Sequence, residues 1–332
     1  MKTIRWGIIG CGDVTEVKSG PGFYKADHSR LVAVMRRDGA LAADYARRHG
    51  VPRWHDDADA IITAPDIDAV YIATMPDTHR DYVLRCAAAG KAVLVEKPMA
   101  MDHAECREMI AACAAANVPL WVAYYRRALP RFLAVRDMVR DGTIGAVRLV
   151  ISRQFQRLPS TASLPWRVDA VHSGGGLFVD MAVHTLDFLD FAFGPIEAVR
   201  GFAANQGGAY GPEDVVLASC RFARGIYGSG TWCYAADIDD EYNEIVGEKG
   251  RIRFSTSKPV PIRLTRGDAT EELPVDDPPH VHQPLIQSIV DELNGRGACP
   301  STGVTAARTT WVTDQILREY RATKVTRPRN AA

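Results

Sequence analysis

The stretch IRWGIIGCGDVT, from Ile4 to Thr15, joins a β-branched apolar run to a turn that contains two glycines. A first strand that runs into G-x-G lets the backbone turn tightly and approach a pyrophosphate, whose charge the N-terminus of the next helix meets. The same turn also occurs as an ordinary strand–helix connection, and its position at the start of a β-α-β rhythm is what favours nucleotide binding. The expected phosphate-contacting residues are Gly10, Cys11, Gly12, Asp13 and Val14.

The residues that follow the turn modify this expectation. Thr15 stands where the dinucleotide fingerprint usually has Gly or Ala, which affects the packing of helix on strand more than the phosphate contact. Gly20-Pro21 predicts that the first helix is short or broken.

The first third of the chain alternates short apolar runs with Ala-rich segments of helical periodicity. The expected strands are Ile4–Ile9, Leu31–Met35, Ala69–Ala73, Ala92–Val95 and Leu120–Ala123, and the expected helices are Leu41–His49, Thr78–Ala89 and His103–Ala116. Strand, helix and strand at this spacing predict a parallel sheet covered on both faces. Residues 1–123 are therefore expected to form a doubly wound Rossmann domain that binds a dinucleotide.

The rhythm changes near Tyr124, where longer alternating runs typical of antiparallel strands begin. These runs are Ala146–Gln154, Ile196–Ala203, Val215–Phe222, Gly225–Tyr234, Tyr242–Val246 and Gly250–Phe254. Helices are expected at Leu129–Arg140, at about Gly176–Phe193 and at about Val304–Arg321, with a loop at Asp276–His282. We predict that residues 124–332 form a second α/β domain with a mainly antiparallel open sheet.

Composition narrows the class of protein. The chain has 332 residues, 47% hydrophobic and 24% charged, with 40 Lys plus Arg against 40 Asp plus Glu, so it carries no basic footprint for nucleic acid or anionic membrane. Its apolar runs fall short of the ~20 residues of a membrane span, and the N-terminus is expected to be a strand rather than a signal peptide. Seven cysteines without a C-x-x-C pair or zinc spacing predict a reduced, cytoplasmic protein with no metal site.

The end of the second strand bears on the choice of cofactor. An acid at this position usually binds the ribose hydroxyls of NAD(H), but here Met35 is followed by Arg36 and Arg37. A guanidinium pair suits a 2′-phosphate, so NADP(H) is favoured over NAD(H). Asp38 is the counter-argument, and the two arginines are also compatible with solvated loop charges.

Two motifs further along carry residues suited to chemistry. Val95-Glu96-Lys97-Pro98 follows the fourth expected strand, and Gly174-Gly175-Gly176 precedes a helix that carries Asp180 and His184. Each motif alone has a plainer explanation, because a lysine after a strand is usually inert and an Asp and His four apart often form a surface ion pair. Asp180 and His184 lack a third ligand at sensible spacing, so metal binding is not expected.

In combination these motifs resemble the glucose–fructose oxidoreductase, inositol dehydrogenase and rhizopine-catabolism (Gfo/Idh/MocA) family. The resemblance covers nearly the whole chain and rests on Glu96–Pro98, on the triple glycine followed by D-x-x-x-H, and on A-T-x-P-D-x-H at Ala73–His79. It also includes Tyr125-Arg126-Arg127, where the family often has N-R-R and where tyrosine alters what is recognised. The resemblance implies hydride transfer between NAD(P) and a secondary alcohol or ketone of a sugar, polyol or cyclic diol, by a homodimer or homotetramer.

The resemblance also implies roles for individual residues. Lys97 would hold the substrate oxygen and the nicotinamide ribose, His184 would act as general acid/base, and Asp180 would orient it or bind a substrate hydroxyl. Since they are four apart on a helix, Asp180 and His184 can face one pocket. The remaining expected cofactor contacts are Thr74, Met75, Pro76, His79, Glu96, Trp166 and Arg167, and Tyr125 and Arg126 are the remaining substrate contacts.

Two other functions fit the same motifs. One is a catalytically silent dinucleotide-binding regulator, against which the intact Lys97 and His184 argue. The other is a cofactor-recycling glycosidase of the same fold, which would produce no net redox change in the nicotinamide.

Overall fold

The chain folds into two compact units, each described here by itself. The computed structural model describes residues 1–158 and 166–325. The first unit comprises Met1–Leu129 together with Asp277–Ala307, and the second comprises the remainder. The boundary expected after residue 123 assigned residues 277–307 to the second domain, whereas in the structure they pack with the first unit.

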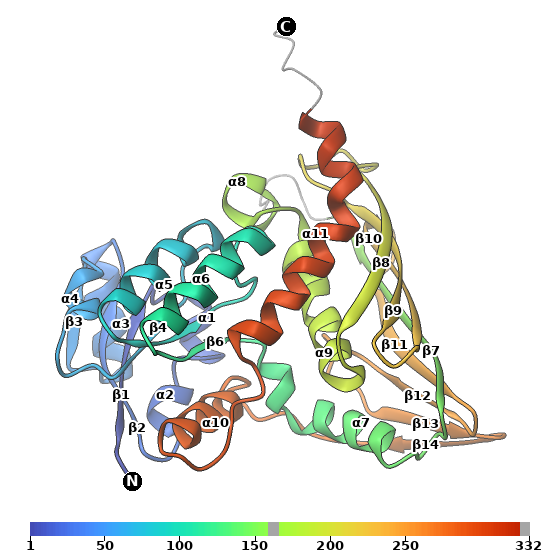
Figure 1. The fold of residues 1–332 in the computed structure, drawn as a ribbon, viewed down its shortest axis with the longest axis horizontal. Coiled ribbons are helices and arrows are strands. Elements are labelled where there is room, and N and C mark those ends of the chain that lie inside the picture. Colours follow the sequence, from blue (N-terminus) through green and yellow to red (C-terminus); the bar gives the residue numbers. More distant parts are fainter. Residues whose placement is uncertain (159–165, 326–332) are drawn as a thin grey trace, which may run out of the picture. The chain divides into compact units, whose positions relative to one another are not determined.

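Six parallel strands form the sheet of the first unit, in the order β3-β2-β1-β4-β5-β6 (Figure 1). The strands are β1 (Ile4–Ile9), β2 (Ser29–Met35), β3 (Arg53–His55), β4 (Ala69–Ile72), β5 (Ala92–Val95) and β6 (Leu120–Val122). This order reverses at β1, and in such sheets a ligand binds beyond the carboxyl ends of the strands at the point of reversal. The predicted Rossmann architecture is confirmed.

Helices cover both faces of this sheet because successive strand residues point to opposite sides. Trp6 and Ile8 belong to a buried cluster with Tyr45 and Ile286, whereas a Cβ on Gly7 would meet Ile61. The helical segments of this unit are α1 (Asp13–Val17), α2 (Gly22–Lys25), α3 (Gly39–His49), α4 (Asp59–Ile62), η1 (Pro76–Thr78), α5 (His79–Ala88), α6 (His103–Ala115), η2 (Tyr125–Ala128) and α10 (Gln283–Leu293).

The first helix is interrupted, as Gly20-Pro21 predicted. Helix α1 ends at Val17 and the separate short helix α2 begins at Gly22, so Gly20 lies in the break between them. A Cβ on Gly20 would clash with the Thr15 carbonyl oxygen and with the Tyr45 hydroxyl, so the break fits against α3. The long helix α11 (Gly303–Val325) begins in this unit and continues into the second.

Eight strands form the sheet of the second unit, in the order β14-β13-β12-β11-β7-β10-β9-β8. Only β7 and β10 pair in parallel, so the prediction of a mainly antiparallel sheet is confirmed. The strands are β7 (Val147–Arg157), β8 (Ile196–Ala204), β9 (Val215–Phe222), β10 (Tyr227–Ala236), β11 (Asp240–Gly247), β12 (Arg251–Phe254), β13 (Ile262–Arg266) and β14 (Ala269–Leu273).

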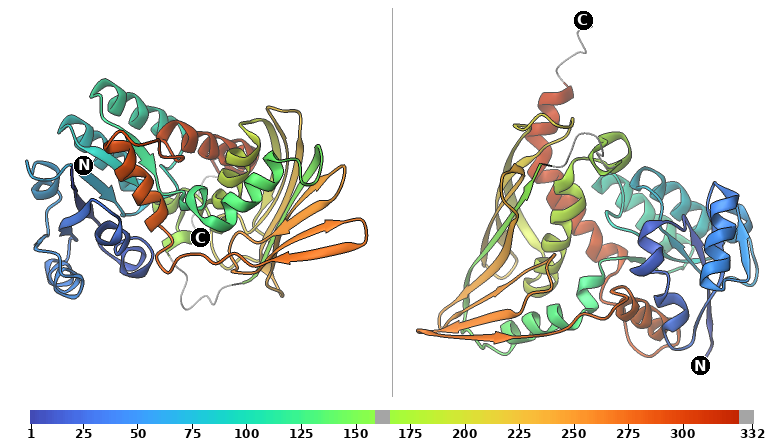
Figure 2. Two further views of the ribbon diagram at one scale, coloured as in Figure 1. Left: turned by 90° about the horizontal axis from the view of Figure 1, so that it is seen from below. Right: turned by 180° about the vertical axis from the view of Figure 1, so that it is seen from behind.

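Helices cover one face of this sheet and leave the other open (Figure 2). The rings of Phe132, Phe188 and Phe254 join α7, α9 and β12 at centroid distances of 5.0–6.2 Å. Fully burying such a side chain contributes about 1.5–3 kcal/mol. The helical segments of the second unit are α7 (Pro130–Arg140), η4 (Trp166–Val168), α8 (Ala170–Ser173), the π-helical η5 (Phe178–Ala182) and α9 (Val183–Phe193).

Candidate functional site

The glycine turn after β1 uses its two glycines in different ways. Gly10 has a φ of +91°, and a Cβ there would lie 2.8 Å from Thr74 Cγ2 and 2.9 Å from the Ala73 carbonyl oxygen. Gly12 has an extended backbone, and a Cβ there would have the Gly10 carbonyl oxygen as its nearest neighbour, at 3.9 Å. Gly10 is therefore required by the fold, while Gly12 leaves open space for a bound group.

Thr15 completes the turn instead of disturbing it. Its buried hydroxyl accepts a hydrogen bond from the Gly12 N–H at 3.0 Å and donates to the Gly12 carbonyl at 2.7 Å. The Tyr45 hydroxyl donates to the Thr15 carbonyl at 2.9 Å. The Thr15 side chain is thus accommodated through its hydrogen bonds to the Gly12 main chain, and the helix still packs closely against the strand.

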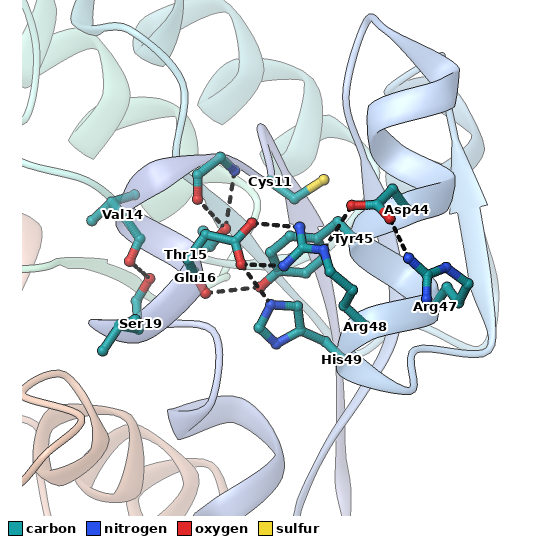
Figure 3. Close-up of polar contacts among 12 residues, drawn as sticks. Cys11, Val14, Thr15, Glu16, Ser19, Asp44, Tyr45, Arg47, Arg48 and His49 are labelled. Carbon is teal, nitrogen blue, oxygen red and sulfur yellow. Dashed lines mark hydrogen bonds and ion pairs between the residues drawn. The ribbon is translucent and has the colours of Figure 1, made fainter.

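A charged cluster fixes α1 to α3 from the side (Figure 3). The Glu16 carboxylate accepts bonds from Arg48 at 2.6 and 2.7 Å and contacts His49 Nε2 at 2.9 Å. Mainly through the bonds from Arg48, the pKa of Glu16 falls to about 2. Because the Glu16 and Arg48 side chains are 34% and 40% exposed, the ion pair adds little stability, and its effect is to orient the short helix behind the turn.

The Arg36 guanidinium lies beside the glycine turn. Its Nη1 donates to the Cys11 carbonyl at 3.5 Å, and the side chain is half-buried while Arg37 is exposed. Asp38, the acid that favoured NAD(H), caps α3 by accepting the Leu41 N–H at 3.1 Å. Its carboxylate is therefore engaged with its own helix.

The loop after β4 is joined to the loop after β5 by His79. Its Nε2 faces the Thr74 carbonyl at 3.1 Å, and its Nδ1 faces the carbonyls of Pro98 and Met99 at 3.1 and 3.3 Å. The side chain is fully buried, and burial lowers the pKa of His79. His79, a predicted cofactor contact, braces the two loops, and of the neighbouring predicted contacts Thr74 and Met75 are partly accessible while Pro76 is buried.

Glu96 and Lys97 follow strand β5, and their side chains point in different directions. Glu96 is buried, and its carboxylate accepts the Tyr71 hydroxyl at 2.5 Å and the Lys97 N–H at 3.1 Å. Within residues 91–100 Lys97 alone is not buried. Lys97, predicted to follow the carboxyl end of the strand, is therefore the partly accessible residue of an otherwise buried segment, whereas the Glu96 side chain points into the protein.

Tyr125 and Arg126 stack in η2 of the same unit. The Arg126 guanidinium lies 4.8 Å from the centre of the Tyr125 ring, and this ring stacks on His282 at 4.3 Å. His282 comes from the loop before α10, so the stack joins two segments that are distant in sequence.

In the second unit, the predicted helix begins with a single π-helical turn that contains Asp180. Between Leu177 and Asp190 every residue is buried except Asp180, Met181 and His184. The two predicted catalytic side chains thus lie on the single partly accessible face of a buried helix. π-Helical turns of this kind are frequent at functional sites.

Arg167 binds Asp180. Its Nε lies 3.2 Å from the Asp180 carboxylate, and its guanidinium lies 4.8 Å from the centre of the Trp166 ring. The W-R pair, expected at the cofactor, is therefore linked directly to the acid expected at the substrate.

The glycine run before the helix serves packing within the chain. A Cβ on Gly175 would clash with Val179 Cγ2, and one on Gly176 would lie 2.5 Å from the Glu213 carbonyl oxygen. The Glu213 carboxylate also accepts the Gly176 N–H at 2.9 Å, and burial raises the pKa of Glu213. These glycines therefore let the 212–213 segment approach closely and hold the start of the helix.

Four polar residues were not assigned to the site from sequence. They are Glu213, Tyr234 and Gln154, of which the last two are joined at 3.1 Å on neighbouring strands, and His282 beside Glu96. Gln154 could have been identified from sequence, because it is a polar residue at a position of β7 where the alternation of the strand predicts a core-facing side chain. Among residues 1–158 and 166–325, no group of three or more His, Cys, Asp or Glu side chains could hold a metal ion.

Comparison with known proteins agrees with this geometry over both units. Residues 4–124 match the model of the oxidoreductase family with an NAD-binding Rossmann fold, and residues 132–253 match the GFO/IDH/MocA C-terminal domain. The chain belongs to the Gfo/Idh/MocA oxidoreductase family. The resemblance predicted from the motifs is confirmed, and so is the assignment as an NAD(P)-dependent oxidoreductase.

Relatives in this family share most of the chain. It is 37% identical to Oxidoreductase P35 of Formosa agariphila over 318 residues, covering 94% of this chain and 97% of that one. It is 32% identical to inositol 2-dehydrogenase of Rhizobium meliloti over 286 residues, covering 83% and 82%. The solved structure of aldose-aldose oxidoreductase from Caulobacter crescentus, complexed with glycerol, superposes with a TM-score of 0.86 at 25% identity, covering 98% of this chain and 99% of that one.

Thiol chemistry is expected to be dispensable for this oxidoreductase. Cys11 lies inside the glycine turn but is fully buried, and burial raises its pKa to about 11, so little of the reactive thiolate forms near neutral pH. Cys11→Ser should keep kcat within about twofold, since side-chain changes outside the chemistry alter free energies by roughly ±0.5 kcal/mol. Steady-state kinetics with a cofactor titration checks this, and loss of turnover at unchanged cofactor affinity would show that the thiol takes part in the reaction.

Proposed function

We propose that this oxidoreductase transfers a hydride between a nicotinamide dinucleotide and a secondary alcohol or ketone of a sugar, polyol or cyclic diol. The observation that carries the proposal is the accessibility pattern: Lys97 is the one partly accessible residue in its segment, and Asp180 and His184 share the partly accessible face of theirs. The relative named inositol 2-dehydrogenase supports a polyol as substrate.

The residues of the first unit fit a dinucleotide. Gly12 leaves the space that a pyrophosphate needs, Arg36 lies beside the turn, and the Thr74–Pro76 loop and Lys97 lie at the carboxyl ends of β4 and β5. When bound, the nicotinamide accepts or donates the hydride. We assign the first unit to cofactor binding, with Tyr125 and Arg126 as further substrate contacts, and the second unit, Pro130–Asp276 and Arg308–Ala332, to substrate binding and assembly.

The chain's own groups then handle the proton and the charge. In oxidation the carbinol carbon loses hydrogen with its electron pair, and the hydroxyl oxygen loses a proton. His184 takes that proton, and the Lys97 ammonium stabilises the negative charge that grows on the oxygen. Asp180, held by Arg167 at 3.2 Å, accepts a hydrogen bond from a substrate hydroxyl or orients His184. Reduction runs through the same steps in reverse.

NADP(H) is the proposed cofactor, because Arg36 borders the turn while Asp38 is engaged as a helix cap. Arg36→Asp is expected to weaken NADP(H) binding by roughly 1.5–3 kcal/mol, the contribution of a hydrogen bond to a charged group. Fluorescence titration with both dinucleotides measures this, and Arg30→Asp, at the opposite end of β2, removes the same charge as a control. Tighter binding of NAD(H) than NADP(H) by the unmodified protein would reverse the assignment.

The open sheet supports a homodimer or homotetramer. Phe202, Leu217 and Tyr227 on strands β8–β10 expose 74%, 48% and 60% of their surface, and burying such apolar side chains between copies is favourable.

All seven cysteines, each within the described residues, are free, which fits the proposed cytoplasmic location. None of the helices that the structure describes has the length and apolar character to cross a membrane.

A substrate panel tests the function as a whole. Aldoses, inositols, linear polyols and cyclic diols are incubated with NAD⁺ and with NADP⁺, and the reduced nicotinamide is followed by its absorbance. Turnover with a net redox change supports the proposal. Tight cofactor binding without turnover on the whole panel favours a regulator, and glycoside cleavage without net redox change favours a cofactor-recycling glycosidase.

A further inference from the structure

Behind Lys97 the first unit buries a polar cluster that the proposed reaction does not use. The Tyr71 hydroxyl donates to Glu96 Oε1 at 2.5 Å and contacts Ser19 Oγ at 3.2 Å. His282 Nδ1 lies 3.7 Å from the same Glu96 oxygen, while Glu96 Oε2 accepts the Lys97 N–H at 3.1 Å. Ser19 follows α1, Tyr71 lies in β4, Glu96 follows β5 and His282 precedes α10.

His282 is held in this cluster from three sides. Its backbone N–H donates to the Lys18 carbonyl at 3.1 Å, and its ring stacks on Tyr125 with 4.3 Å between the ring centres. Only 1% of the surface of His282 is exposed. Helix α10, which follows it, packs on α2 through Ile286 and Gly22. The ring therefore has a fixed position relative to Glu96.

The imidazole of His282 is neutral in this environment. Burial, and then the nearby cations Lys18, Arg126 and Lys97, lower the pKa of His282 to about 3. The Glu96 carboxyl and the phenol of Tyr125 also face the His282 ring. A neutral imidazole carries one N–H, and among the residues that the structure describes Nδ1 has no hydrogen-bond partner within bonding distance. A shift of a few tenths of an ångström would let Nδ1–H donate to Glu96.

We propose that His282 is a positioning residue for Lys97 that acts through the Glu96 carboxylate, an inference that rests on the oxidoreductase function proposed above. One Glu96 oxygen holds the Lys97 main chain, and the other lies against Tyr71 and His282. A carboxylate supported at both oxygens cannot rotate without moving the peptide that carries Lys97. His282 thereby fixes the direction in which the Lys97 side chain leaves strand β5.

The test compares two replacements that differ in one N–H. In His282→Asn the side-chain amide can still donate near the position of Nδ1, whereas His282→Leu keeps an apolar bulk without a donor. His282→Leu is expected to lower kcat about tenfold, the rate equivalent of one lost hydrogen bond to a charged group, with KM and cofactor affinity changed by less than about threefold. His282→Asn should recover most of that loss. His280→Leu, two residues earlier, changes a half-buried histidine whose ring contacts the Val17 carbonyl and Lys25 but not Glu96, and it should leave kcat unchanged.

Tyr71→Phe provides a second approach in case His282→Leu folds poorly, because it removes the other support of the same oxygen and keeps the ring. Its kcat should fall similarly, and Tyr71→Phe combined with His282→Leu should lose less than the sum of the separate losses. If kcat is unchanged in both single variants, or His282→Asn and His282→Leu lose kcat equally, the proposal is overturned. Lys97→Ala, measured on the same substrate, separates this result from a failure of the proposed function, since only the latter leaves Lys97→Ala fully active.

Discussion

Lys97→Ala is expected to lower kcat by about 10²–10⁴-fold, the range for loss of a positioned group at a reacting oxygen. An ammonium beside this oxygen stabilises charge that grows in the transition state, so its removal affects the chemical step more than binding. Cofactor affinity should change by less than about tenfold, the scale of one hydrogen bond. Steady-state kinetics and a fluorescence titration of the dinucleotide measure both quantities. Lys2→Ala, at an exposed lysine of the same unit, is the matched control.

His184→Ala should show a decrease in kcat of the same order, about 10²–10⁴-fold, because it removes the proton acceptor or donor. The two losses should combine less than additively, since both residues serve one proton and hydride transfer. His172→Ala changes a histidine on α8 of the same unit, 41% exposed, and should keep near-native kcat. Near-native turnover in either Lys97→Ala or His184→Ala would mean that the catalytic residues lie elsewhere.

The parts of the fold that could be predicted are those in which local pattern and burial agree. β5 is buried throughout and is a continuous apolar run, and β1 is buried apart from Arg5, so both strands are predicted from composition alone. The edge strand β3 has only three residues, and Arg53-Trp54-His55 carries no apolar pattern. β14 is exposed along nearly its whole length and is held by pairing with β13, which local sequence does not encode.

Helix α10 was missed although a pattern was present. Leu285, Ile286, Ile289 and Val290 are spaced to share one helix face, and in the structure all four are buried against the first unit. The acidic, proline-rich segment Asp276–His282 directly precedes this helix and predicts a loop, which obscures the helical spacing that begins at Pro284. The consequence was larger than one element, because assigning this segment to the second domain also removed His282 from the vicinity of Lys97.

At the site, sequence predicts side chains by motif and predicts contacts poorly. Lys97, Asp180 and His184 are predicted because their motifs are local in sequence and together resemble those of a known family. The Arg167–Asp180 ion pair, the Glu96–His282 contact and the packing of Gly175 and Gly176 on the 212–213 segment join residues that local pattern cannot relate. Each requires the fold before it can be inferred.

The two glycines of the first turn offer a separation of folding from binding. Gly10→Ala should lower the free energy of unfolding by about 2 kcal/mol or more, because a φ of +91° is strained for alanine and its Cβ would press on Thr74 and the Ala73 carbonyl. Gly12→Ala should leave it within roughly 0.5 kcal/mol, since the extended backbone suits alanine and the nearest atom is 3.9 Å away.

Cofactor affinity is expected to respond to Gly12 even though stability does not. The space beside Gly12 is open to the turn, and a methyl group there would occupy volume that a pyrophosphate needs for close approach to the backbone. Gly12→Ala should therefore weaken dinucleotide binding at least about tenfold, which is ~1.4 kcal/mol. Thermal or denaturant unfolding of the apo protein and titration of each variant with the dinucleotide give the two quantities separately. A Gly12→Ala protein that binds the dinucleotide with native affinity would show that the pyrophosphate does not approach this turn, and the cofactor site would then have to be sought at another strand end.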